Sequence, residues 1–158
     1  MIIPIEFMEV YIMRKELAVK VNGYLANVAV SYVKLHNLHW NVVGPQFKAV
    51  HEYLESIYDA YAAVLDAVAE LLKMQDEMPL SRMSDYLAAA SIKEIEAKEY
   101  SVEESIQIVL ADMEEMKAQA ADIRALADED DNFPVVNMME DNLAEYSKNI
   151  WFLKSMLK

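Results

Sequence analysis

The amino-acid sequence predicts an all-α protein, a four-helix bundle with a short extra helix in the connection between helices two and three. Helix breakers are few, since the 158 residues include two Gly and four Pro, and both residue types interrupt helices. The stretches between them carry apolar residues at helical steps of three and four. Hydrophobic residues make up 55% of the chain, which is enough to bury a core, and we expect residues 1–158 to form a single domain.

Two long antiparallel helices are predicted in the first half of the chain. Apolar residues at helical spacing run from Tyr11 to Trp40, where the pattern tolerates Gly23 at about 1 kcal/mol relative to Ala. The same pattern resumes after Gly44-Pro45 and runs from Phe47 to Leu72. Because the turn between the two stretches is short, we expect the helices to pack side by side in opposite directions.

The long connection and the second half of the chain predict three more helices. The segment from Ser81 to Ala90 is long enough for one short helix. Ser101 and Glu104 match a capping box, which satisfies free backbone N–H groups at a helix start, and predict a long helix from there to about Ala127. Asn132 predicts the N-cap of a last helix that reaches the C-terminus. We find no strand signal.

Charge and composition exclude several classes of function. With 14 Lys and Arg against 27 Asp and Glu, the net charge is −13, which argues against binding to DNA, RNA or an anionic membrane. The absence of Cys excludes disulfides and thiolate metal sites. The apolar stretch Met1 to Ile5 is too short for a signal peptide, and no stretch reaches the roughly 18 apolar residues of a membrane span. We expect a cytoplasmic protein with no membrane partner.

Two histidines flank the turn between the first two helices. His39 ends the first helix and His51 lies near the start of the second, so antiparallel packing brings them to similar heights, where both can face one metal ion. Glu55 follows His51 by one helical turn on the same face. Imidazole and carboxylate ligands suit iron, manganese or zinc. His36 fits no such pattern and is expected to be a hydrogen-bonded core residue.

A second acidic pair, Asp66 and Glu70, repeats the four-residue spacing further along the second helix. Asp66 follows Glu55 by 11 residues, which is roughly 16 Å along a helix, whereas metal–ligand bonds are about 2 Å. The two groups therefore cannot bind one ion within a single chain. They either form unrelated sites or meet across a two-fold axis, where an antiparallel second copy places its Asp66 and Glu70 beside the first copy's His51 and Glu55.

These residues resemble the Dps family of mini-ferritins, and the resemblance extends over essentially the whole chain. It rests on the stretch from His39 to Phe47, with its Trp-Asn and Gly-Pro-x-Phe, and on His51, Glu55, Asp66 and Glu70. The resemblance implies a ferritin-like fold, a dodecameric homo-oligomeric shell that stores iron in its cavity, and a ferroxidase centre at each two-fold interface. His39, His51 and Glu55 would come from one subunit, and Asp66 and Glu70 from its neighbour.

For the reaction, the resemblance implies oxidation of Fe(II) to Fe(III), with hydrogen peroxide expected in preference to oxygen, and protection against oxidative damage. Glu55, at a position where the family more often has Asp, is the expected ligand between two irons. His39, His51, Asp66 and Glu70 are the expected terminal ligands. Two roles for Trp40 have equal weight, a quencher of stray oxidising equivalents beside the metals and a packing residue.

Two further expectations concern the charged surface. Members of the family that condense DNA usually carry a Lys-rich terminal arm, but residues 1–20 hold only Arg14, Lys15 and Lys20, so DNA binding is not expected. The acidic run from Asp128 to Asp131 is either a solvated loop or part of a negative entrance for Fe(II) around a three-fold axis. The rival functions are a DNA-coating shell and a metal-free helical interaction protein.

Overall fold

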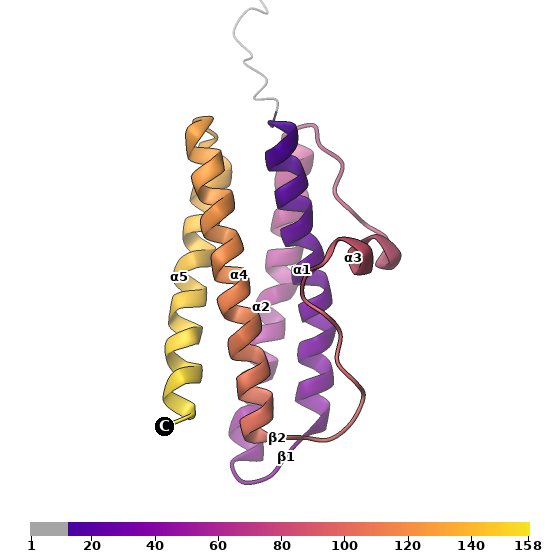
Figure 1. Cartoon of the computed structure of the whole chain (residues 1–158), viewed down its shortest axis with the longest axis vertical. Coiled ribbons are helices and arrows are strands. Elements are labelled where there is room, and N and C mark those ends of the chain that lie inside the picture. The colour runs from indigo at the N-terminus through magenta and orange to yellow at the C-terminus, as the bar shows by residue number, and fades with distance from the viewer. Residues whose placement is uncertain (1–12) are drawn as a thin grey trace, which may run out of the picture.

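Four long helices form the body of the molecule in the computed structural model, which describes residues 13–158. Within that range the long helices are α1 (Lys15–Asn41), α2 (Phe47–Met74), α4 (Val102–Glu129) and α5 (Phe133–Met156). All four run along the long axis of the molecule (Figure 1). The predicted all-α bundle is confirmed, and each predicted helix overlaps an observed one.

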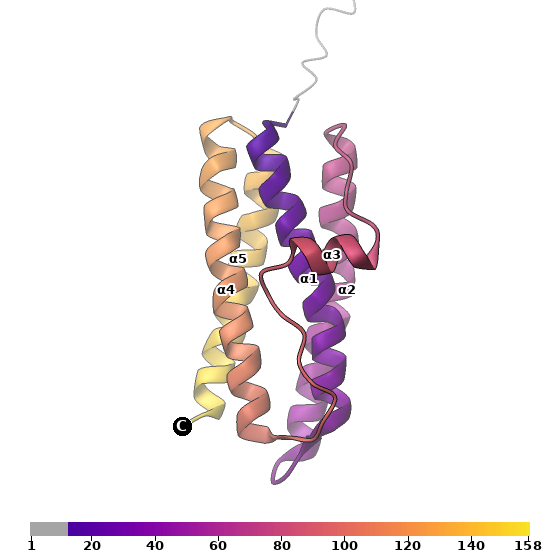
Figure 2. The same cartoon turned by 45° about the vertical axis from the view of Figure 1, so that its right-hand side comes forward.

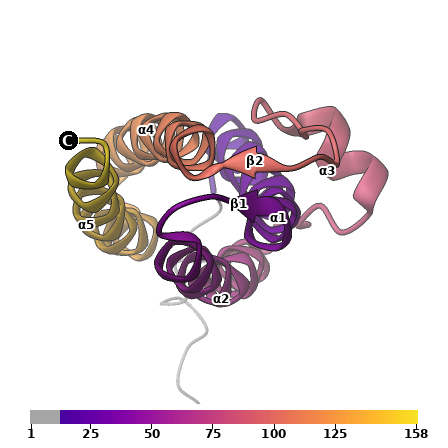
Figure 3. The same ribbon diagram turned by 90° about the horizontal axis from the view of Figure 1, so that it is seen from below.

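The view along the bundle shows how the helices are ordered (Figure 3). α1 lies beside α2 and α4, and α5 lies beside α4. Short turns join α1 to α2 and α4 to α5, so each of these pairs is antiparallel. The long connection between α2 and α4 passes along the outside of α1 and carries the short helix α3 (Met83–Ala89) (Figures 1 and 2). The predicted extra helix is thus confirmed.

Two very short strands lie at the end of the bundle where α1 ends and α4 begins. β1 (Val42–Val43) directly follows α1, and β2 (Tyr100–Ser101) directly precedes α4. They pair in parallel, with Val42 opposite Tyr100. The expectation of no strand is therefore wrong at this point. Two residues are too few to show the apolar alternation by which a strand is recognised in a sequence.

The structure confirms the predicted N-terminal cap of α4, whereas the predicted cap of α5 makes no capping hydrogen bond. Ser101 Oγ accepts the Glu104 N–H at 3.1 Å, and the Glu104 carboxylate accepts the Ser101 N–H at 2.9 Å, which confirms the capping box. Asn132 stands at the N-cap of α5, but its side chain makes no capping hydrogen bond. Its amide instead exchanges two hydrogen bonds with the buried Gln75 amide, at 2.7 and 3.0 Å. This pair ties the α4–α5 turn to the end of α2.

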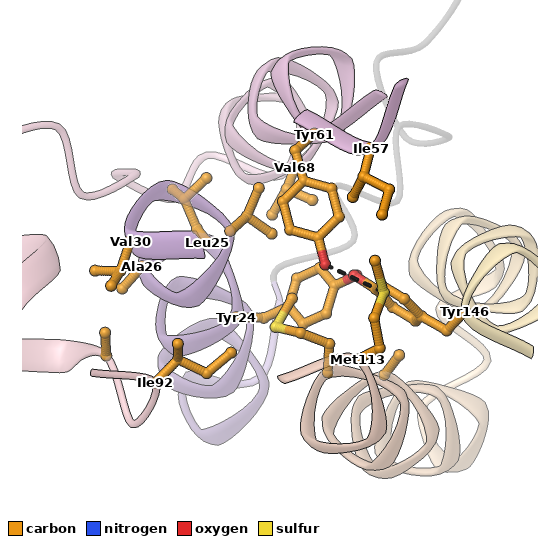
Figure 4. Packing of buried hydrophobic residues seen from close by; sticks show 14 of the residues in the cluster. Tyr24, Leu25, Ala26, Val30, Ile57, Tyr61, Val68, Ile92, Met113 and Tyr146 are labelled. Carbon is orange, nitrogen blue, oxygen red and sulfur yellow. Dashed lines mark hydrogen bonds between the residues drawn. The ribbon is translucent and has the colours of Figure 1, made fainter. Parts of the chain in front are cut away.

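The centre of the bundle contains tyrosines as well as aliphatic side chains (Figure 4). Tyr24 on α1 and Tyr146 on α5 bring their hydroxyl oxygens to 2.5 Å across one diagonal of the bundle. Across the other diagonal, Tyr61 on α2 donates to the sulfur of Met113 on α4 at 3.6 Å. The two contacts lie close together (Figure 4), so buried polar groups join all four long helices near the bundle axis.

Two expectations fall on residues 1–12, which lie outside the described part of the chain. They are the start of the first helix at Tyr11 and the absence of a signal peptide or anchor at Met1 to Ile5. Within the described residues α1 begins at Lys15. Among the helices of that part, none has both the length and the apolar character that a membrane crossing requires.

Candidate metal centre

The turn between α1 and α2 brings two histidine rings together. Gly44 has a φ of 115°, and Gln46 is left-handed with a φ of 66°, so the chain reverses within a few residues. Gly44 adopts its φ readily because Gly has no Cβ. His39 in the last turn of α1 and His51 in the second turn of α2 consequently stack, with ring centroids 3.7 Å apart and planes 19° from parallel. The two histidines thus meet at the same height of the bundle.

Reciprocal hydrogen bonds hold both imidazole rings. His39 Nδ1 lies 2.8 Å from the carbonyl oxygen of His51, and His51 Nδ1 lies 2.8 Å from the carbonyl oxygen of His39. Because a carbonyl oxygen only accepts, these partners assign the proton to Nδ1 and leave a lone pair on each Nε2. Both Nε2 atoms are therefore available to a metal, in rings whose orientation is already set by the backbone.

Glu55 completes a group of three ligand residues. One ligand atom from each of His39, His51 and Glu55 lies within 4.8 Å of the other two. His39 is 7% exposed, His51 is half-buried and Glu55 is exposed, so the group opens to solvent on the carboxylate side. Two imidazoles and one carboxylate suit Fe, Mn or Zn. Three protein ligands also leave coordination positions open, as catalytic metal sites require.

Tyr58 packs against the ligand group and was not predicted from the sequence. Its ring stands edge-on to the His39 ring at a centroid distance of 5.2 Å and stacks on His36 at 3.8 Å. Partial burial raises the pKa of the Tyr58 phenol, and the carboxylates of Glu55 and Asp59 raise it further. Tyr58 follows Glu55 by three residues, so helical spacing places it on the ligand face and was the signal that could have found it.

His36 and Trp40 lie beside the ligand group. His36 Nδ1 is 2.7 Å from the carbonyl oxygen of Tyr32, which confirms the expected hydrogen bond. The residue is only half-buried, so its expected place in the core is wrong. Trp40 is 69% exposed, and its ring centroid lies 5.4 Å from that of His36. Within one chain Trp40 therefore packs only in part, against His36. The quencher role stays a prediction.

Asp66 and Glu70 do not reach this group within one chain. Both side chains are exposed on α2, which is one uninterrupted helix from Phe47 to Met74. Asp66 lies 11 residues beyond Glu55, or roughly 16 Å along the helix axis. The structure thus separates the five predicted ligands into the two groups that the spacing indicated. Their meeting across a two-fold axis involves a second copy and stays a prediction.

Arginines pair with much of the acidic run at the α4–α5 turn. Arg14 lies 3.2 Å from Glu129 and 2.9 Å from Asp130, and Arg124 lies 3.0 Å from Asp128. Asp128 and Glu129 belong to the last turn of α4 rather than to a loop. The two arginines offset part of the negative charge that an entrance for cations would use. The entrance itself stays a prediction.

Comparison with known proteins agrees with the fold and identifies the family. The ferritin-like domain family matches residues 19–158. A curated relative named DNA protection during starvation protein, from Brevibacillus brevis, is 35% identical over 141 residues, which are 89% of this chain and 94% of the relative. The crystal structure of a Dps protein from Bacillus brevis has a TM-score of 0.88 at 33% identity, and the match covers 91% of this chain and 96% of that one.

A third comparison names the metal chemistry of a similar protein. A Dps crystal structure from Vibrio cholerae O1, described as a member of a broad superfamily of ferritin-like diiron-carboxylate proteins, has a TM-score of 0.87 at 31% identity. The match covers 91% of this chain and 90% of that one. The sequence identity, the shared fold and the nearly complete coverage lead to one assignment. This chain belongs to the Dps family of ferritin-like proteins.

Proposed function

We propose that the protein oxidises Fe(II) to Fe(III) at centres shared by two copies of the chain and stores the ferric product in a hollow homo-oligomeric shell. One observation carries this function: two free Nε2 atoms stand beside Glu55, in rings that are held by hydrogen bonds before any metal binds. Membership of a ferritin-like family, and the diiron-carboxylate description of a similar structure, support iron as the substrate.

A two-fold axis across the middle of α2 would complete each centre. In an isologous pair, residue i of one copy contacts residue j of the other, and j contacts i in return. Asp66 and Glu70 would then lie beside His51 and Glu55 of the second copy. The exposed side of the Glu55 carboxylate supports this approach, because it is open within one chain. Each dimer would contain two equal centres.

Two irons at one centre suit hydrogen peroxide as the oxidant. Two Fe(II) ions give up two electrons, and one peroxide takes both electrons with two protons and leaves as two waters. A lone Fe(II) gives peroxide only one electron, which splits it into a hydroxide ion and a hydroxyl radical. Carboxylate oxygens stabilise Fe(III) more than Fe(II), because the more highly charged ion gains more from an anionic ligand. We assign the bridging position to Glu55 and the terminal positions to His39, His51, Asp66 and Glu70.

An anaerobic Fe(II) titration followed by a peroxide pulse tests the activity through the ferric absorbance. We expect Asp66→Ala to lower the initial rate by about tenfold or more, since it removes one ligand from every centre. Glu114→Ala, which removes an exposed acid from α4, diagonally opposite α2, is the control and should keep the parent rate. Equal rates for Asp66→Ala and the parent would contradict the assignment.

Mixed shells test whether two copies share each centre. Assembled alone, His51→Ala and Asp66→Ala subunits each lack one ligand at every centre. In a dimer of one of each kind, one centre has both residues and the other centre lacks both. Random pairing makes half of the dimers mixed, so co-expression should restore about one quarter of the centres. Activity no higher than that of the separate variants would mean that the ligands come from one chain.

Removal of Fe(II) and peroxide would protect DNA without any contact between the protein and the DNA. The curated relatives include proteins named for DNA protection during starvation, whereas the net charge of −13 in this chain disfavours a coat on DNA. We place the reaction in the cytoplasm, as the sequence predicts. A gel shift at low salt tests the rival function, because retardation of linear DNA by the iron-free protein would favour DNA coating.

A further inference from the structure

We propose that the seam between α2 and α5 binds a small aromatic cation, at a site distinct from the histidine pair. A cavity of about 350 Å³ lies between these two helices. Pockets for small organic molecules begin at about 300 Å³, so this volume admits a molecule with one ring and a short polar group. None of the five proposed iron ligands lines the cavity, so its occupant need not compete with iron.

The cavity reaches from the surface to the bundle axis. Extensive contacts join α1 to α2 and α4 to α5, whereas α2 and α5 are not among the closely packed pairs of the described chain. Ala60 on α2, at the outer side, is exposed, and Met113 on α4 lines the inner side. Since α4 lies diagonally opposite α2 (Figure 3), a cavity that touches Met113 must extend to the centre. Figure 4 shows that Met113 meets Tyr61 there.

Aromatic side chains form much of the cavity wall. Tyr53 and Tyr61 come from α2, and Tyr146 and Phe152 come from α5. The faces of aromatic rings carry partial negative charge and attract organic cations, as in pockets that bind quaternary ammonium groups. Tyr53 donates from its hydroxyl to Asn149 Oδ1 at 2.8 Å, across the seam, and its ring centroid lies 6.4 Å from that of Phe152. The Tyr53 ring on α2 is therefore held in place by contacts with Asn149 and Phe152 on α5.

The charges around the cavity favour a cation over an anion. Its rim carries Glu145 and Lys148, whose charged atoms are 3.8 Å apart and whose side chains are 68% and 56% exposed. These two charges largely cancel each other at short range. The electrostatic potential at the cavity is then set by the whole chain, whose net charge of −13 makes it negative. The phenol rings of the wall stay neutral at physiological pH, since burial raises the pKa of Tyr53 to about 12.

Calorimetric titration of the assembled, iron-free protein with three probes tests the site. Benzyltrimethylammonium has the ring and the positive charge, phenylmethanesulfonate has the ring with a negative charge, and tetramethylammonium has the charge without the ring. We expect one benzyltrimethylammonium per chain, and binding of the other two probes weaker by about tenfold or more. Equal affinity for the sulfonate, or for the cation that lacks a ring, would overturn the proposal.

Variants of the cavity locate the bound probe. Ala60→Phe fills the outer side of the cavity without a change of charge and should abolish binding of benzyltrimethylammonium. Ala118→Phe, at an exposed Ala on α4 outside the cavity, is the matched control and should bind like the parent. Unchanged binding in Ala60→Phe would overturn the proposal. If Ala60→Phe does not fold, Tyr53→Leu removes one ring of the wall and should weaken binding.

Substitution of the two charged rim residues, Glu145 and Lys148, gives an independent check on the charge of the ligand. Glu145→Gln removes a negative charge and should weaken binding of benzyltrimethylammonium, whereas Lys148→Gln removes a positive charge and should strengthen it, each by about threefold at low salt. Both residues are exposed, so neither change should disturb folding. Shifts of the same direction in the two variants, or no shift in either, would contradict a cation site.

Discussion

The tyrosine hydroxyls at the bundle centre couple folding to pH. Tyr24 and Tyr146 share a hydrogen bond of 2.5 Å, and Asn142 Nδ2 donates to the Tyr24 hydroxyl at 3.1 Å. Burial raises the pKa of Tyr24, Tyr61 and Tyr146 above the ordinary value for tyrosine. In an unfolded chain the same phenols ionise near pH 10, at about their model-peptide value. Native and unfolded states therefore hold different numbers of protons in alkaline solution.

We expect the free energy of unfolding to decrease as the pH rises above about 10. Below that pH both states keep the phenolic protons and the full stability is present. Above it the unfolded state has lost protons that the native state still holds, so stability falls with pH until the native phenols ionise as well. Urea denaturation at a series of alkaline pH values measures the fall, and Tyr61→Phe should make it shallower. A constant free energy of unfolding would contradict the shared burial of these hydroxyls.

At the same scale, the sequence predicts which ligand residues share a helix face but not what holds them. The spacing of His51 and Glu55, and the position of His39 across a short turn, are enough to place the three together. The reciprocal bonds between each Nδ1 and the other histidine's carbonyl depend on how far the turn rotates α1 against α2, which no residue spacing specifies. Tyr58 belongs to the same helix face as Glu55, but an aromatic residue there is equally consistent with ordinary core packing.

At the scale of elements, long helices are predictable because each has enough turns to show its period. The contacts that join different elements are less predictable. The β1–β2 bridge pairs Val42 with Tyr100, and the amide pair joins Gln75 to Asn132; both link positions far apart in the chain, and neither has a local pattern. Asn132 is an example: its sequence context predicts an N-cap, but its side chain is hydrogen-bonded to Gln75, 57 residues earlier in the chain.

Two glycines in different elements should respond oppositely to substitution by Ala. Gly23 lies inside α1, where a Cβ would meet nothing within 4 Å, so Gly23→Ala should stabilise the fold by about 1 kcal/mol through helix propensity. Gly44 also has free space but a φ of 115°, which an L side chain rarely adopts, so Gly44→Ala should destabilise by about 1 kcal/mol or more. Urea unfolding under identical conditions measures both. A destabilised Gly23→Ala would show that the glycine serves a contact outside one chain.

At the scale of the whole molecule, one chain exposes apolar groups beside the three ligand residues His39, His51 and Glu55. Trp40 is 69% exposed and Phe47 is 43% exposed, and the Phe47 ring lies 5.1 Å from that of His51. Large exposed side chains of this kind mark an interaction surface when they gather at one place. Exposure depends on how α1 and α2 come together, so the helical pattern of each segment could not reveal it. A second copy that brings Asp66 and Glu70 to the centre would cover these rings as well.

The fluorescence of Trp40 shows whether assembly covers the centre. Trp151 is also exposed, at 65%, so the two tryptophans must be observed separately. In a Trp151→Phe background we expect the Trp40 emission of the assembled protein to be blue-shifted and protected by about threefold from acrylamide quenching, because an interface removes the indole from water. The Trp40→Phe background reports Trp151 in the same assembly as a comparison. Trp40→Glu should separate the copies and lower the rate of iron oxidation as much as Asp66→Ala does, since an isolated chain has only His39, His51 and Glu55 at its centre. An assembled protein in which Trp40 is fully accessible to acrylamide would place the interface elsewhere and remove the basis for shared ligands.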